Sequence, residues 1–122
     1  MVLTKLQNFL LQKLYTNTPV GNLSTDFVVI IASLCGQKLD EETVQKGSDL
    51  EKQLTKKHGS ITYPLLEVDN ETALTDSHAI AAYLARSNGK DALLGSNDFE
   101  SAQVDQWMEF LRAETTPLVK AL

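Results

Sequence analysis

The stretch ITYPLLEVDNETALTDSHAIAAYL, residues 61–84, contains the signals that decide the fold. Residues 61–68 are rich in strand-forming side chains and are interrupted by Pro64, and residues 71–74 form a second such run. A turn-forming Asp-Asn pair at 69–70 lies between the two runs. The pattern therefore predicts two short strands joined as a β-hairpin.

A helix is predicted directly after this hairpin. Thr75, Asp76 or Ser77 can cap its N-terminus, because a short polar side chain accepts hydrogen bonds from the unpaired N–H groups of the first turn. An Asn-Gly pair at 88–89 ends it. Apolar residues recur at helical spacing between these signals, at Ile80, Tyr83 and Leu84.

Upstream of the hairpin, the sequence predicts a strand, a helix, an edge strand and a second helix, over residues 13–17, 24–35, 37–45 and 48–57. The first helix starts at Ser24 and stops before Gly36. Its apolar residues lie on more than one side, so we expect it to be largely covered. The second helix begins with the capping-box pattern S-x-x-E at residues 48–51.

A last helix is predicted downstream, opened by the polar residues 96–98. Pro117 should kink or end it, because proline removes a helical hydrogen bond. Its apolar stripe consists of Val104, Trp107, Met108 and Leu111. The complete order is β-α-β-α-β-β-α followed by one helix, which predicts an α/β fold with a mixed sheet and helices packed on it.

This order and several motifs resemble the glutathione transferase superfamily. The run YPLLE at 63–67 resembles the family's strand VP-x-LE, and DSHAIAAYL at 76–84 resembles its helix start E-S-x-A-I-x-x-Y-L. LLG at 93–95 and AQVDQW at 102–107 resemble the linker and first helix of the family's all-helical second domain. The resemblance implies a thioredoxin-like first domain and a cis peptide bond before Pro64.

The resemblance divides the chain into three parts. Residues 1–13 are an N-terminal extension with a helical stripe of leucines, and residues 14–89 are the glutathione-transferase-like N-terminal domain. Residues 90–122 are a linker and the first helix of a truncated C-terminal domain. Within the superfamily, residues 14–16 and 88–107 are similar to the gamma subunit of elongation factor 1B.

If glutathione binding is retained, the resemblance places it at Tyr63, Pro64, Asp76 and Ser77. Backbone groups beside the proline could pair with an extended peptide, and a helix N-terminus favours a carboxylate. The alternative is structural. In that case Pro64 fixes a bend and Asp76 only caps its helix, which is worth about 1 kcal/mol.

No catalytic residue is predicted. In the family, the catalytic hydroxyl or thiol follows the first strand, whereas residues 16–22 of this chain contain no serine, cysteine or tyrosine. Tyr15 is explained as a core residue, Ser24 as a helix cap and Cys35 as a core cysteine. The two histidines lack neighbours at metal-ligand spacing, so no metal site is predicted.

Composition limits the classes of partner. The 122-residue chain has a net charge of −5, which disfavours direct binding to nucleic acid, because nucleic-acid binders present a clustered basic face. No apolar run approaches the ~20 residues of a membrane-spanning helix. One cysteine and no secretory signal favour the cytoplasm. The alternative is a mitochondrial location, with residues 1–13 as a targeting segment.

We expect a protein partner or further subunits to cover the last helix, with Trp107, Met108 and Leu111 at the interface. The favoured hypothesis is a non-catalytic interaction module that serves as a scaffold in a larger assembly, such as the elongation factor 1B complex. One alternative is a glutathione-binding transferase or a fragment of one, and only there is a cofactor, glutathione, expected. The other is an accessory subunit of a mitochondrial complex.

Overall fold

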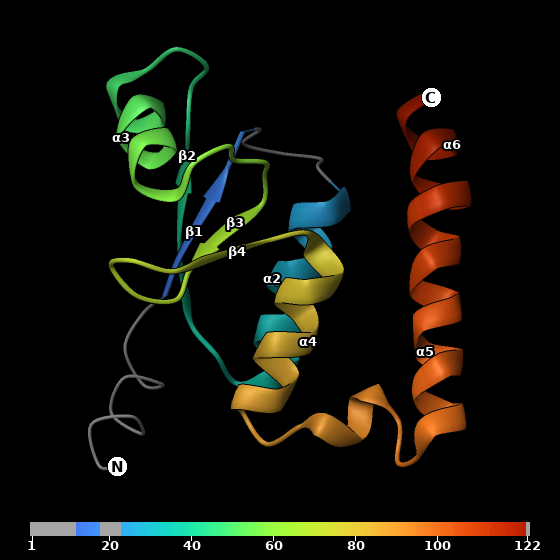
Figure 1. The fold of residues 1–122 in the computed structure, drawn as a ribbon. Helices are drawn as coiled ribbons and strands as arrows, with labels where there is room; N and C mark the ends of the chain where they lie inside the picture. Colours follow the sequence, from blue (N-terminus) through green and yellow to red (C-terminus); the bar gives the residue numbers. More distant parts are fainter. Residues whose placement is uncertain (1–11, 18–22, 122) are drawn as a thin grey trace, which may run out of the picture.

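The computed structural model describes residues 12–17 and 23–121, so the leucine stripe expected near the N-terminus lies outside the described part. In the labels of Figure 1, the elements are β1 Gln12–Thr16, α2 Leu23–Cys35, β2 Leu39–Thr43, α3 Asp49–His58, β3 Leu65–Glu67, β4 Ala73–Thr75, α4 Ser77–Ser87, a 3-10 turn Asp91–Leu94, α5 Asp98–Phe110, a π-helical segment Leu111–Thr115 and α6 Thr116–Ala121. This order confirms the predicted fold class. We call α5, the π-helical segment and α6 together the C-terminal arm.

The four strands form one mixed sheet in the order β2-β1-β3-β4. β1 is parallel to β2 and antiparallel to β3, and β3 is antiparallel to β4. The predicted hairpin is present, although β3 and β4 have three residues each and are shorter than the runs that predicted them. The weakly patterned residues 37–45 do contain an edge strand, β2.

Side chains of the central strands alternate between two buried faces. Leu14 and Leu66 are paired across β1 and β3, and both are fully buried beneath α2 and α4. The neighbouring pair, Tyr15 and Leu65, points to the other face, where Leu54 of α3 covers it. Because both faces of β1 and β3 are covered, these strands are apolar at successive positions.

Three helix starts are capped at the predicted places. Ser48, Asp76 and Asn97 each accept a hydrogen bond from the backbone N–H three residues later, at 3.2, 3.2 and 2.9 Å. The prediction for α2 is shifted by one residue: the helix begins at Leu23, so Ser24 lies in its first turn. The Tyr63–Pro64 peptide bond is cis, as the resemblance implies.

The C-terminal helix continues beyond the place where the sequence predicted an end. Pro117 lies in the first turn of α6, where a missing N–H is tolerated best. The π-helical segment directly precedes this turn, and the chain remains helical to Ala121 (Figure 1). The prediction that the helix could end at Pro117 is therefore wrong. No helix in the described ranges is both long and apolar enough to cross a membrane.

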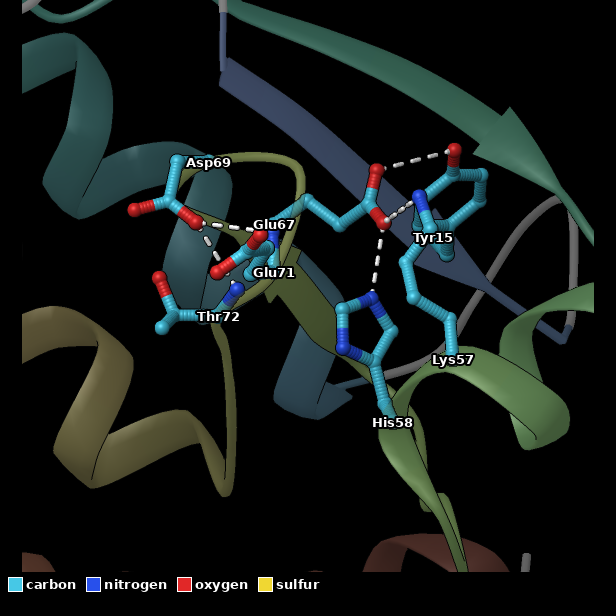
Figure 2. A network of polar contacts seen from close by, with 7 residues as sticks. All are labelled: Tyr15, Lys57, His58, Glu67, Asp69, Glu71 and Thr72. Atoms are coloured by element: carbon cyan, nitrogen blue, oxygen red, sulfur yellow. Dashed lines mark hydrogen bonds and ion pairs between the residues drawn. The ribbon is translucent and has the colours of Figure 1, made fainter.

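A polar cluster around Glu67 holds α3 against the sheet (Figure 2). Glu67 Oε2 lies 2.7 Å from His58 Nε2 and accepts a hydrogen bond from Lys57 Nζ at 3.0 Å. Glu67 Oε1 accepts a hydrogen bond from the Tyr15 hydroxyl at 3.4 Å. Burial alone would raise the pKa of Glu67, but the hydrogen bonds from His58 and Lys57 outweigh it and lower that pKa. The ionised carboxylate thus ties the C-terminal end of α3 to β3.

Leu84→Ala should destabilise the protein by about 2–5 kcal/mol, because removing a fully buried leucine side chain leaves a cavity. Leu34→Ala is the matched control, since Leu34 is also a helical leucine but is 66% exposed. Its loss should change the free energy of unfolding by less than about 0.5 kcal/mol. Urea denaturation measures both variants, and equal effects would contradict the burial described above.

Glu67→Gln should lower the free energy of unfolding at pH 7 by about 1–3 kcal/mol, because the cluster loses its charged acceptor. The pKa of Glu67 is lowered in the folded state, so its carboxylate stabilises the fold above the unfolded-state pKa. This contribution is lost as the pH falls through the folded-state pKa. The variant should therefore lose less stability than the wild type on acidification.

Denaturation curves recorded between about pH 7 and pH 3 would measure this difference. Glu71→Gln is the control, because Glu71 lies exposed in the turn of the same hairpin (Figure 2). The stability of Glu71→Gln should depend on pH in the same way as that of the wild type. A Glu67→Gln profile parallel to that of the wild type would show that the cluster contributes no stability through its charge.

Candidate functional site

A cleft of about 580 Å³ lies between the first turns of α2 and α4 and the middle of the C-terminal arm. The sheet explains why the two helices meet there. β1 and β4 run in the same direction, because each is antiparallel to β3. The helices that follow these two strands therefore begin at the same edge of the sheet (Figure 1).

Asp76 forms part of the α4 wall of the cleft. Its backbone φ is +77°, and no other non-glycine residue in the described ranges has a positive φ. This conformation costs about 1–3 kcal/mol for a residue with a Cβ atom, and such residues are concentrated at functional sites. Asp76 Oδ2 also accepts a hydrogen bond from the Ala79 N–H at 3.2 Å. An aspartate with a strained backbone therefore lies at the N-terminus of α4, beside the cleft.

The opposite wall belongs to the arm. Arg112 lines the cleft, and its Nε donates to Glu109 Oε2 at 3.0 Å. This hydrogen bond lowers the pKa of Glu109 and raises that of Arg112, so both groups stay charged. His78 Nε2 lies 3.2 Å from Asp105 Oδ1, which connects α4 to α5 beside the cleft.

These walls suit a small molecule with both charged and apolar parts. The N-termini of α2 and α4 present backbone N–H groups and the positive ends of their dipoles, which favour a carboxylate. The carboxylate of Asp76 can accept a hydrogen bond from an amine. Phe27 and Met108 add apolar surface to the same cleft. No nucleophile is needed for such binding.

The structure brings together half of the predicted glutathione-binding set. Asp76 and Ser77 line the cleft. Pro64 is fully buried, and the Tyr63 hydroxyl donates a hydrogen bond to Glu51 Oε2 at 3.0 Å, on the α3 side of the sheet. Burial and this bond raise the pKa of Tyr63 to about 12. Whether glutathione binds at Tyr63, Pro64, Asp76 and Ser77 stays a prediction.

The groups weighed for catalysis lie in different places. Ser24 lines the cleft, whereas Tyr15 is buried and directed at Glu67 on the α3 side of the sheet. Cys35 is buried at the far end of α2. Within the described ranges, no three histidine, cysteine or acidic side chains are grouped as metal ligands.

Sequence reasoning missed three residues that line the cleft: Phe27, His78 and Arg112. Phe27 lies on α2, a helix whose apolar residues were expected to be largely covered. Of the expected interface residues, Met108 and Leu111 line the cleft, and Trp107 is exposed with its ring packed edge-to-face on Phe110. The docking of the arm, which no local pattern encodes, decides these positions.

Comparison with known protein sequences gives relatives of two kinds. The sequence pattern of the family described as glutathione S-transferase, N-terminal domain, matches residues 25–87, just over half of the chain. Probable elongation factor 1-gamma 1 of Arabidopsis thaliana is 32% identical over 108 residues, which cover 83% of this chain and 25% of that protein. Human eukaryotic translation elongation factor 1 epsilon-1 is 40% identical over 52 residues, covering 43% of this chain and 30% of that protein.

Solved structures give the same fold. A glutathione S-transferase-I bound with lactoylglutathione superposes with a TM-score of 0.70 at 26% identity, over 88% of this chain and 51% of its own. A C. elegans glutathione transferase superposes with a TM-score of 0.58 at 27% identity, over 84% and 48%. This chain thus spans about a quarter of its elongation-factor 1-gamma relative and half of these transferases. It belongs to the family of glutathione S-transferase N-terminal domains.

Proposed function

We propose that this chain is a non-catalytic protein-interaction module, a scaffold subunit of a larger cytoplasmic assembly such as the elongation factor 1B complex. The observation that carries the proposal is the C-terminal arm, in which none of residues 98–114 is buried. The relatives named elongation factor 1-gamma and 1 epsilon-1 indicate the kind of assembly. In this proposal residues 14–89 supply the supporting fold, and residues 90–122 supply the contact surface.

The energetics of the arm support an interaction role. Its exposed side chains include large apolar ones, namely Phe99, Trp107, Phe110, Leu111 and Leu118. Fully burying one such side chain is worth about 1.5–3 kcal/mol relative to leaving it in water. Several of them on one helical arm form an apolar surface of the kind that marks a binding site. A partner that covers this surface would recover that free energy.

The cleft favours binding over turnover. Its two hydroxyl groups belong to Ser24 and Ser77, and its described lining includes no thiol or phenol. Serine is a weak nucleophile unless an adjacent base activates it.

We expect no conjugation of glutathione to electrophilic aromatic substrates above the uncatalysed rate, because residues 16–22, which follow the first strand, contain no serine, cysteine or tyrosine. A steady-state assay of the full chain measures this rate. Ser24→Ala should give the same trace as the wild type. Turnover well above the uncatalysed rate that disappears in Ser24→Ala would overturn the non-catalytic assignment.

A second function, glutathione binding without turnover, is favoured by the positive φ of Asp76 at the cleft. Glutathione carries two carboxylates and an amine, which match the helix N-termini and the Asp76 carboxylate. Titration calorimetry should then give saturable binding to the wild type. Asp76→Ala should weaken it at least tenfold, the loss of about 1.4 kcal/mol expected for one charge-assisted hydrogen bond.

Ser48→Ala is the matched control for this experiment. Ser48 caps α3 as Asp76 caps α4, but it does not line the cleft. Each change removes a cap worth about 1 kcal/mol, so the two variants should lose similar stability. Binding that is absent in the wild type, or equally weakened by both changes, would leave Asp76 with a capping role alone.

A further inference from the structure

The negative charge of the chain is concentrated in its C-terminal part. Residues 91–121 carry six acidic and two basic residues, a net charge of −4, whereas residues 1–90 carry ten acidic and nine basic residues, a net charge of −1. Asp105 and Glu109 pair with His78 and Arg112. Glu114, about one helical turn beyond Phe110, is exposed. The arm is therefore an acidic surface on a domain that is otherwise close to neutral.

An exposed aromatic stripe runs along the same arm. Phe99, Trp107 and Phe110 are 72%, 64% and 49% exposed. Trp107 and Phe110 follow Phe99 by eight and eleven residues, which is about two and three turns, so all three lie on one side of α5. The rings of Trp107 and Phe110 are in edge-to-face contact, with centroids 5.8 Å apart. We call these three residues the aromatic stripe.

The aromatic stripe is separate from the side of α5 that meets the domain. Val104 and Met108 lie on that inner side, where they line an apolar cavity of about 140 Å³ together with Phe27 and Ile31 of α2. Figure 1 shows the arm standing beside α2 and α4 and joined to them through the 3-10 turn. If the inner side of α5 packed fully against α2, the aromatic stripe on its other side would still be exposed.

We infer that the aromatic stripe docks a basic, amphipathic helix of a partner protein, an inference that rests on the proposed function as an interaction module. Apolar side chains of the partner helix pack between the three rings, as an amphipathic helix does in an apolar groove. Lysine and arginine side chains at its edge face the exposed Glu114, about one helical turn beyond Phe110. Aromatic anchors surrounded by a charged rim are the usual composition of such an interface.

The negative charge of the arm favours a cationic partner helix over a second copy of the chain, a nucleic acid or an anionic lipid surface. A second copy of the chain would place two arms of net charge −3 against each other, and like charges across an interface oppose association. A nucleic acid or an anionic lipid surface is repelled for the same reason. A cationic protein helix matches both the apolar stripe and the charge of the arm.

Two designed helical peptides test the inference on the full chain. They share one leucine face and differ only at their polar positions, which are lysine in one peptide and glutamate in the other. Trp107 is the only tryptophan, so its fluorescence should shift to shorter wavelength when a peptide covers it. The lysine peptide should bind at least tenfold more tightly than the glutamate peptide. This preference should disappear at about 1 M salt, where the Debye length falls to ~3 Å.

Two substitutions locate the binding surface, with anisotropy of a labelled lysine peptide as the readout. Phe110→Ala should weaken binding at least tenfold, because aromatic anchors dominate such interfaces. Glu114→Lys should weaken it about threefold to tenfold at low salt and have little effect at high salt. Leu34→Ala removes an exposed leucine from α2 and should leave binding unchanged. If Phe110→Ala fails to fold, as judged by circular dichroism, Phe99→Ala replaces it.

Several results would overturn the inference. One is equal binding of the two peptides, and another is binding that resists both Phe110→Ala and Phe99→Ala. No binding of either peptide is a third. Light scattering of the chain alone adds a fourth: a dimer that Phe110→Ala dissociates would make a second copy the occupant. None of these results bears on catalysis. The non-catalytic assignment is tested separately by the conjugation assay, so the two failures can be distinguished.

Discussion

Leu14 and Leu66 face each other across β1 and β3 beneath α2 and α4, and the placement of the other elements depends on this contact. Successive strand residues point to opposite faces, so a slip of one position would bring Lys13 or Tyr15 under the helices instead of Leu14. Each buried leucine contributes about 1.5–3 kcal/mol. This register directs α2 and α4 to one face. Because β1 and β4 run in the same direction, both helices begin at one edge, where the cleft opens.

The helices on the two faces of the sheet are held by different kinds of interaction. α2 and α4 are held by apolar contact, with fully buried side chains on both helices and on the central strands. α3 combines the buried Leu54 with the polar cluster around Glu67, in which the His58 side chain is nearly buried. Hydrogen bonds inside such a cluster are strong because water is excluded, and they become costly when one member is removed. The α3 face therefore depends on the ionised state of the Glu67 carboxylate.

The C-terminal arm has two different sides. Its inner side forms a wall of the cleft through Met108 and Arg112, and its outer side carries the aromatic stripe. A small ligand in the cleft and a helix on the stripe would touch different side chains of one helix. The arm is tied to the domain mainly through the 3-10 turn and the pair of His78 with Asp105. Scaffold and ligand-binding roles are thus compatible in this fold.

The sequence by itself determined the elements that depend on local chemistry. Ser48, Asp76 and Asn97 cap helices by bonding three residues ahead, and the hairpin and family motifs are equally local, so all of these could be predicted. The tertiary structure alone decided strand lengths, because pairing partners limit them, and the continuation of the helix through Pro117. It also decided that Phe27 and Arg112 share a cleft. These two residues are far apart in the chain. Only the position of the arm beside α2 and α4, held through the 3-10 turn and the His78–Asp105 pair, places them together, and no sequence period encodes it.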